Sequence, residues 1–308
     1  MSIYVSGSLA YDRIMNFPDK FSNHILPDKL HILNVCFLVN DLEERFGGTA
    51  GNIAYSLALL DEKATILAAA GSDYGRYQKW LYKHGISQDG IRTVQDAPTA
   101  SAYITTDHAD NQITAFNPGA MNVPTNGHFS GFDTSSRLAI VSPGNLQDME
   151  NYPQIYREKD IPFIFDPGQN IPAFSGAQLK AMIKGSKILI ANDYELSLVM
   201  QATGLDKNGL LQLTSAIITT LGEEGCVVTE QAFEQRIPAV KVGNAQDPTG
   251  CGDAFRSGLI KGLLLDKELK EAAKLGATCA SFCVEHKGTQ EHRFTLDQFW
   301  DRFVSAYE

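Results

Sequence analysis

Residues 247–258 read Asp-Pro-Thr-Gly-Cys-Gly-Asp-Ala-Phe-Arg-Ser-Gly, and the interpretation of the whole chain starts from them. Two glycines flank Cys251, Asp253 follows at once, and the apolar residues beyond it recur with helical spacing. Glycine lets backbone approach a ligand closely, and the first turn of a helix presents unpaired N–H groups with partial positive charge. Such a turn suits a phosphate that becomes more anionic in a transition state, and a carboxylate there could accept a proton from an attacking alcohol. An isolated Gly-x-Gly-Asp is equally compatible with a turn that caps an ordinary core helix.

Composition bounds the fold and the partners. The 308 residues, 44% hydrophobic and 20% charged, permit a single α/β domain with a small appendage. A net charge of −10 argues against non-specific nucleic-acid binding, which needs a basic surface. No apolar run approaches the ~20 residues that span a bilayer, and residues 1–8 do not read as a signal peptide. We therefore expect a cytoplasmic protein with neither nucleic-acid nor membrane partners.

The cysteines predict reduced thiols. Five cysteines without regular spacing do not make a disulfide framework, which agrees with a reducing compartment. Cys279 and Cys283 are four residues apart and share a predicted helix face; without a second pair they are expected to be small core residues rather than zinc ligands. Cys251 lies at a predicted helix start, where a thiol is acidified and reactive.

A regular alternation of strands and helices predicts a doubly wound, mostly parallel sheet with helices on both faces, in one domain over residues 1–308. The predicted strands are 3–5, 138–141, 162–165, 188–191 and 216–221, and the predicted helices are 53–60, 147–158, 175–184, 193–203, 253–264, 267–285 and 295–306.

The first half of the chain also contains segments that favour a small separate sheet. Residues 30–39 are apolar and β-prone, and residues 100–106 and 112–116 flank the polar turn 107–111. We expect these segments to pair into a small β lid, formed by parts of about 8–46 and 96–121, that closes over a ligand and excludes water.

Two polar features lie near the start of the chain. Asp12 is expected just past the first strand, where ligands bind in open α/β sheets, and it could accept hydrogen bonds from vicinal hydroxyls. Its alternative is a solvated loop carboxylate. Gly47 and Gly48 precede a helix, so backbone N–H groups could face a ligand beside Asn52; no Gly-Lys-Ser/Thr follows, which excludes a P-loop.

Further polar features follow other predicted strands, and in a doubly wound sheet they converge on one edge. These are Asn192 to Glu195, Thr220 to Gly222, and Gly250 to Asp253. Asn192 and Glu195, three residues apart, could serve a hydrated Mg²⁺ ion or form a capping box, and the two roles are compatible. Motifs of serine hydrolases, zinc proteases, dithiol oxidoreductases and dinucleotide-binding folds are absent, and no histidine stands out as catalytic.

Taken together, these motifs, in this order and across essentially the whole chain, resemble the ribokinase/PfkB family of ATP-dependent carbohydrate and nucleoside kinases. The resemblance rests on Gly47-Gly48 with Asn52, Asn192-x-x-Glu195, Thr220-Leu-Gly222, and Asp247-Pro-Thr-Gly-Cys-Gly-Asp253. The family usually has Ala or a similarly small residue where this chain has Cys251, a change that leaves the backbone donors intact.

The resemblance implies the role of each site residue. Asp253 would be the general base, and the amides of Gly250, Cys251 and Gly252 the anion hole. Ser8, Asp12, Gly47, Gly48 and Asn52 would hold the acceptor, together with Phe116 and Met121 from the lid. ATP would be held by Asn192, Thr220, Gly222 and Gly225, flanked by segments around Val242 and Cys279 to Cys283. Glu195 would orient Mg²⁺ through water, and Asp247 and Thr249 would bind K⁺.

Within the family, Asn117-Pro-Gly-Ala-Met121, Gly7-Ser-Leu-Ala-Tyr-Asp12 and residues 23–29 resemble bacterial adenosine kinases. Apolar lid residues such as Phe37, Leu38 and Phe116 suit a flat purine. We therefore expect an adenosine kinase that phosphorylates the 5′-hydroxyl to give AMP and ADP. A ribokinase-like sugar kinase, a guanosine/inosine-type nucleoside kinase and a non-catalytic binding module remain as alternatives. Either a monomer or a homodimer paired through the lid is compatible with the sequence.

Overall fold

The larger of two β-sheets forms the centre of the molecule. The structure is a computed structural model that describes residues 3–308 apart from 33, 110, 126, 129, 133–135, 137 and 232. Over these residues the large sheet has nine strands, and all neighbours from β11 to β5 are parallel, whereas β12 and β13 add an antiparallel edge. In sheet order the strands are β13 (Phe233–Ile237), β12 (Cys226–Glu230), β11 (Ile217–Thr220), β10 (Ile188–Asn192), β9 (Phe163–Phe165), β8 (Ala139–Val141), β1 (Ile3–Ser6), β4 (Ala64–Ala70) and β5 (Ile91–Thr93).

Helices cover both faces because successive strand residues point to opposite sides and both sides are apolar. In β1, Ile3 and Val5 pack in one hydrophobic cluster while Tyr4 packs in the other. The first cluster contains residues of α1, α2, α7 and α8, the second residues of α3 to α6, and α9 packs on α8 in a third. The helices are α1 (Thr49–Leu59), α2 (Gly75–Lys83), α3 (Leu146–Glu158), α4 (Gly176–Ile183), α5 (Asp193–Thr203), α6 (Lys207–Leu210), α7 (Cys251–Leu264), α8 (Leu269–Val284) and α9 (Leu296–Tyr307). The predicted doubly wound α/β fold is confirmed.

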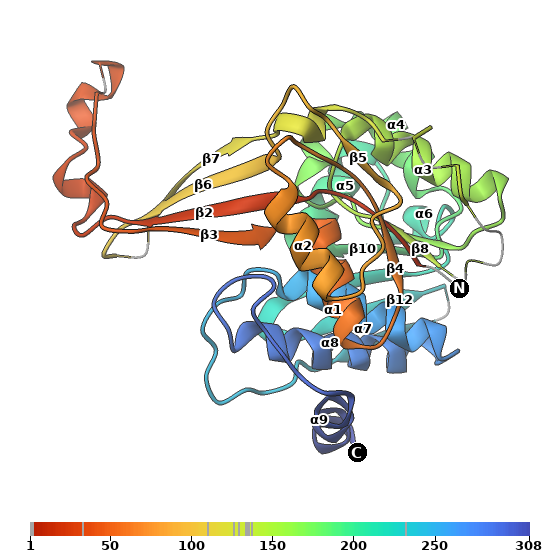
Figure 1. Ribbon diagram of the computed structural model, residues 1–308. Coiled ribbons are helices and arrows are strands. Elements are labelled where there is room, and N and C mark those ends of the chain that lie inside the picture. Colours follow the sequence, from red (N-terminus) through yellow and green to blue (C-terminus); the bar gives the residue numbers. More distant parts are fainter. Residues whose placement is uncertain are drawn as a thin grey trace.

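The second sheet projects from this body (Figure 1). Its order is β3 (Leu42–Gly47), β2 (Ala10–Asn16), β6 (Ala100–Thr106) and β7 (Gln112–Asn117), with only the β2–β6 pair parallel. The predicted β6–β7 hairpin is confirmed, although residue 110 of its turn lies outside the described residues.

The predicted strand at residues 30–39 is wrong. The chain there forms a 3₁₀ helix, Pro27–Ile32, followed by irregular backbone, and Leu33 lies outside the described residues. Phe37 packs against Phe17 and Phe21, with ring centroids 4.9 Å away in each case. The apolar residues of this segment are therefore used in an aromatic cluster at the tip of the second sheet, and β propensity without a pairing partner does not make a strand.

Other differences concern neighbouring segments. Asp12 lies within β2, not in a loop after β1, because Ala10–Asn16 pairs with strands on both sides. Irregular residues 238–250 separate β13 from α7, so the Gly250 turn does not directly follow a strand. The described helices include none that is both long enough and apolar enough to cross a membrane.

Glycines allow α7 and α8 to pack closely. A Cβ atom on Gly258 would lie 2.2 Å from the carbonyl oxygen of Leu275, and one on Gly262 would lie 2.5 Å from Cα of Ala272. The backbones therefore approach more closely than any side chain permits. This contact fixes α7, and with it the Asp253 turn, against the rest of the helical layer.

The substitution Gly258→Ala tests this contact. We expect a loss of about 1–3 kcal/mol in the free energy of unfolding, because the new methyl group meets backbone that cannot move aside. Gly75→Ala is the matched control, since a Cβ atom on this helical glycine meets nothing within 4 Å. Chemical denaturation of both variants is the measurement. Equal stability of the two variants would contradict close packing at Gly258.

Candidate active site

A cavity of about 230 Å³ lies at the carboxyl ends of the parallel strands. The strand order reverses between β1 and β8, which is where open α/β sheets form their binding crevice. Six predicted site residues line the cavity: Asn192, Glu195, Thr220, Gly250, Gly252 and Asp253. Its other lining residues are Thr49, Pro143, Asp166, Gly168, Gln169 and Arg256. The predicted convergence of these turns on one sheet edge is therefore observed.

Asp253 is held by a residue 201 positions earlier in the chain. Nδ2 of Asn52, in the first turns of α1, donates a hydrogen bond of 2.8 Å to Oδ2 of Asp253. Oδ1 of Asn52 accepts from Nε2 of Gln290 at 3.0 Å, which fixes the orientation of the amide. Burial raises the pKa of the Asp253 carboxyl to about 6, while Arg256 and Asn52 limit the rise. A carboxyl group with such a pKa is ionised at neutral pH and able to accept a proton.

The start of α7 supplies backbone donors next to this carboxylate. Gly250 precedes the helix with a φ of +81°, and a Cβ atom there would lie 2.9 Å from Cβ of Thr289, so this position requires glycine. The amide of Cys251 donates to the carbonyl of Pro248 at 3.1 Å and is engaged in the turn. Within the described residues the amides of Gly250, Gly252 and Asp253 have no hydrogen-bond acceptor, so they are available to an anion, whereas the predicted Cys251 amide is not.

Gly47 and Gly48 were predicted to let backbone N–H groups at the start of α1 face a ligand, but the next two amides are engaged within the protein. The amides of Thr49 and Ala50 donate to the hydroxyl and carbonyl oxygens of Ser8, each at 3.0 Å, so they are not free for a ligand. Gly48 has a φ of +88°, and a Cβ atom on it would lie 2.6 Å from the carbonyl oxygen of Ser8. The glycine pair thus brings Ser8, in the segment between β1 and β2, against the start of α1.

Asp12 lies against Gly47. A Cβ atom on Gly47 would be 2.3 Å from Oδ2 of Asp12, so the missing side chain makes room for the carboxylate. Burial raises the pKa of Asp12 to about 6; the guanidinium of Arg45 opposes the rise and Asp247 adds to it. Asp12 also contributes to the raised pKa of Asp253. Gly47 therefore makes room for Asp12, and the charge of Asp12 acts on Asp253, to which Asn52 is hydrogen-bonded.

Asn192 and Glu195 form the predicted capping box and line the cavity. The side chain of Asn192 accepts from the amide of Glu195 at 2.7 Å, and Oε2 of Glu195 accepts from the amide of Asn192 at 2.9 Å. Burial raises the pKa of Glu195, and the hydrogen bond from Asn192 opposes the rise. Capping fixes one carboxylate oxygen and leaves the other for a further ligand.

The remaining predicted residues do not line this cavity. Asp247 accepts from the amides of Thr249 and Gly288, both at 2.9 Å, which holds residues 247–253, the signature loop, to the loop after α8. Gly222 and Gly225 adopt φ values of +58° and +93° in the turn after β11. Val242 is partly buried, Phe116 is half-exposed on β7, and Met121 lies in a 3₁₀ turn.

The predicted placement of Cys279 and Cys283 beside a nucleotide needs correction at the level of their side chains. Both thiols are completely buried in the cluster that α8 forms with α7 and α9, as expected from their helical spacing. Sγ of Cys283 lies 3.6 Å from the carbonyl oxygen of Thr249, and its single proton is donated either to this carbonyl or to the thiolate of Cys251. Cys283 therefore contacts the signature loop, and neither side chain is exposed to a ligand.

Sequence reasoning missed several polar residues of the site. Arg256 and Asp166 form a buried ion pair beside Asp253, and Gln290 links Asn52 to Tyr77 and Trp80. Arg256 could have been found, because it is a cation one helical turn after Asp253 and so lies on the same face of the predicted helix. Gln290 has no local signal, since its importance comes from a contact across 238 residues.

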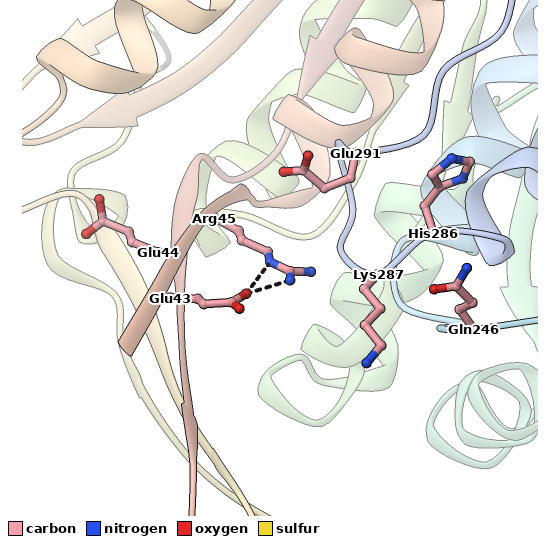
Figure 2. A pocket seen from close by; sticks show the side chains of 7 residues that line it. All are labelled: Glu43, Glu44, Arg45, Gln246, His286, Lys287 and Glu291. Atoms are coloured by element: carbon pink, nitrogen blue, oxygen red, sulfur yellow. Dashed lines mark hydrogen bonds and ion pairs between the residues drawn. The ribbon is translucent and has the colours of Figure 1, made fainter. Parts of the chain in front are cut away.

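A second cavity, of about 560 Å³, opens between β3, the segment before α7 and the segment after α8 (Figure 2). Its lining is strongly polar, with Glu43, Glu44, Arg45, Gln246, His286, Lys287 and Glu291. Arg45 is paired with Glu43 through Nη2–Oε2 at 2.6 Å, as Figure 2 shows. The guanidinium of Arg45 also lies beside Gly288, near Asp12 and Asp247, so the second sheet reaches the signature loop through this residue.

Comparisons with known proteins show the family and the fold of this chain. The profile of the pfkB family carbohydrate kinases matches residues 11–295. The nucleoside kinase of Burkholderia thailandensis, solved in complex with inosine, is 37% identical and superimposes with a TM-score of 0.87 over 100% of this chain and 98% of that one. A nucleoside kinase of Methanocaldococcus jannaschii is 27% identical over 89% of both chains. A ribokinase of Thermotoga maritima shares the fold, with 20% identity and a TM-score of 0.79 over 99% of both chains.

The thiol of Cys251 gives a prediction. A hydrogen bond with Cys283 lowers the pKa of Cys251, against burial and the nearby carboxylates of Asp247 and Asp253. We expect iodoacetamide to modify Cys251 at lower pH than the exposed Cys36, because alkylation requires the thiolate. Mass spectrometry of labelled peptides across a pH series measures this difference.

Cys283→Ala is the matched variant for this measurement. It removes the hydrogen bond, so the labelling profile of Cys251 should move to higher pH while that of Cys36 stays in place. Identical profiles for Cys251 and Cys36 in the unsubstituted protein would contradict the acidified thiol.

Proposed function

Since the chain belongs to the pfkB family of carbohydrate kinases, phosphotransferases that act on hydroxyl groups, we propose that it transfers the γ-phosphoryl group of ATP to the 5′-hydroxyl of a purine nucleoside, with adenosine as the acceptor. The observation that supports this most strongly is the position of Asp253. Its carboxylate accepts a hydrogen bond from Asn52 and lies at the start of α7, beside backbone amides that have no acceptor in the described part of the chain. The nucleoside kinases of B. thailandensis and M. jannaschii support a nucleoside as the substrate class.

The acceptor would lie between the two sheets. Asp12 would accept hydrogen bonds from the ribose 2′- and 3′-hydroxyls, and Asn52 would donate to the sugar; Gly47 and Gly48 would let it approach the backbone. Ser8 would support this position through α1. The four-stranded sheet would act as a lid within a single-domain kinase, with Phe116 and Met121 closing on the base.

Transfer then needs one base and one anion site. The 5′-oxygen attacks the γ-phosphorus, the bond from that phosphorus to the β–γ bridging oxygen breaks, and the proton of the hydroxyl passes to Asp253. ADP leaves with the bridging oxygen. The amides of Gly252 and Asp253 would stabilise the charge on the transferred group, and positioning and electrostatics would carry most of the catalysis.

The ATP side would be formed by Asn192, Thr220, Gly222, Gly225 and the segment around Val242. Mg²⁺ suits this side because it keeps several waters and needs only one or two carboxylates. Glu195 fits that requirement, since only one of its carboxylate oxygens is used in the capping box. The bound ion would neutralise phosphate charge. Among the described residues no group of three His, Cys, Asp or Glu side chains forms a metal cage.

K⁺ would bind beside the signature loop. Asp247 is the candidate, because its two oxygens are oriented by single hydrogen bonds from Thr249 and Gly288 and retain lone pairs. The hydrogen bonds from these amides keep the pKa of Asp247 low, although burial opposes them. The carbonyl and hydroxyl oxygens of Thr249 would complete the protein ligands.

Inosine is the second candidate acceptor, favoured by the inosine complex of the B. thailandensis enzyme. Free sugars are a third possibility, since a rice fructokinase and a ribokinase of Haemophilus influenzae are each 24% identical to this chain. An assay with Mg-ATP and adenosine, inosine, guanosine, ribose or fructose separates them. We expect the largest kcat/KM for adenosine; a larger value for a free sugar would contradict the proposal.

The variant Asp253→Asn tests the base. It keeps the shape of the side chain but cannot accept the proton, so kcat should fall by about 10²–10⁴-fold while the Kd of ATP changes little. Asp301→Asn, on the exposed side of α9, is the control and should retain full turnover. Near-normal kcat in Asp253→Asn would remove this residue from the role of base.

The raised pKa of Asp253 also predicts a pH dependence. The carboxyl is the active form only when ionised, so kcat/KM should be level near neutral pH and fall as the pH drops below about 6, where Asp253 becomes protonated. Because the pKa of Asp12 is also about 6, protonation of Asp12 should weaken acceptor binding over the same range. Activity that persists undiminished down to pH 4 would contradict this assignment.

A further inference from the structure

Arg256 is a buried cation in the wall of the transfer cavity. Only 7% of the residue is exposed, and it lies one helical turn after Asp253 on α7. The guanidinium makes a two-point contact with the carboxylate of Asp166, which is 2% exposed and follows β9; its Nη2 lies 2.8 Å from Oδ1. Such fork-shaped pairs fix a guanidinium in position and orientation.

The same guanidinium holds the first turn of α7. Nη1 of Arg256 donates to the carbonyl oxygen of Gly252 at 2.9 Å. That carbonyl belongs to the peptide unit whose N–H is the amide of Asp253, so its orientation sets the direction of this amide. Arg256 therefore acts on both parts of the site, the carboxylate through its charge and the amide through its hydrogen bond.

We propose that Arg256, clamped by Asp166, is a positioning residue of phosphoryl transfer that keeps Asp253 ionised and aims the backbone amide of Asp253 at the transferred group. This role rests on the proposed function for its catalytic consequence. The effect of the Arg256 charge on the ionisation of Asp253 can be measured by titration, without an assay of activity.

Charged and titratable groups surround Asp253 from every packed element. Arg256 on α7 favours the ionised form, whereas Asp166 after β9 and Asp12 on β2 oppose it. Asn52 on α1 donates a hydrogen bond to the carboxylate. Glu195 on α5 acts on Arg256, and the thiols of Cys251 and Cys283 lie close enough to sense Asp253. Among these groups Arg256 is the only cation, so its removal should raise the pKa of Asp253.

The test is a carbon NMR titration of the Asp253 carboxyl group in protein labelled at aspartate, with the resonance identified by its loss in Asp253→Asn. In Arg256→Met the titration midpoint of Asp253 should rise by about one to three pH units, the usual effect of an adjacent opposite charge. Arg256→Lys retains the charge and should leave the midpoint within about half a pH unit of its original value.

Two further variants separate an electrostatic role from a merely structural one. Lys261→Met removes another partly buried ion pair of α7, with Glu62, two turns away from the cavity, and should not move the midpoint. The double variant Arg256→Met/Asp166→Asn leaves no unpaired buried carboxylate, so it provides the measurement if Arg256→Met alone does not fold. Its midpoint should still rise, but less, because Asp166 opposes ionisation.

Kinetics then test the catalytic consequence. In Arg256→Lys, kcat should fall by about ten- to hundredfold with KM nearly unchanged, because the amide is no longer held in direction. An unmoved midpoint in both Arg256→Met and the double variant would overturn the proposal. A raised midpoint in a protein inactive with every nucleoside would instead overturn the proposed function and leave the electrostatic role of Arg256 established.

Discussion

The hydrogen bond between Asn52 and Asp253 is the contact on which the rest of the site depends. It joins α1 to α7. Helix α1 begins where the projecting sheet meets the body, and α7 begins within the signature loop. Gln290 fixes the amide of Asn52, and Arg256 and Asp166 fix the other side of the Asp253 turn. Asp253, the base of the proposed transfer, is thereby held from both directions.

The backbone permits this arrangement through a few glycines. Gly47 leaves room for the carboxylate of Asp12, and Gly48 lets Ser8 accept hydrogen bonds from the start of α1. Gly250 has the positive φ with which the chain enters α7. Farther along α7, Gly258 allows α8 to lie close enough to hold the helix. At each of these positions a Cβ atom would clash with a neighbouring atom, so the geometry of the site requires glycine there.

Much of this could be predicted from the sequence, because parallel strands and their helices are local, periodic patterns, and the residues of the transfer turn are contiguous. Residues 30–39 were misassigned because apolar, β-prone residues serve equally well in an aromatic cluster, and strand pairing is a non-local property. The amide of Cys251 bonds to Pro248, which only the geometry of the turn reveals. Gln290 has no local signature, and Asp166, the partner of Arg256, lies 90 residues away in the sequence.

The central claim is that an acceptor hydroxyl and a phosphate meet at Asp253. A crystal structure with adenosine and a non-hydrolysable ATP analogue measures this directly, as the distance from the Asp253 carboxylate to the 5′-oxygen. The account predicts about 2.6–3.2 Å, with the γ-phosphate in line at the start of α7. A 5′-oxygen beyond hydrogen-bonding distance of Asp253, with another side chain in contact with it, would contradict the account.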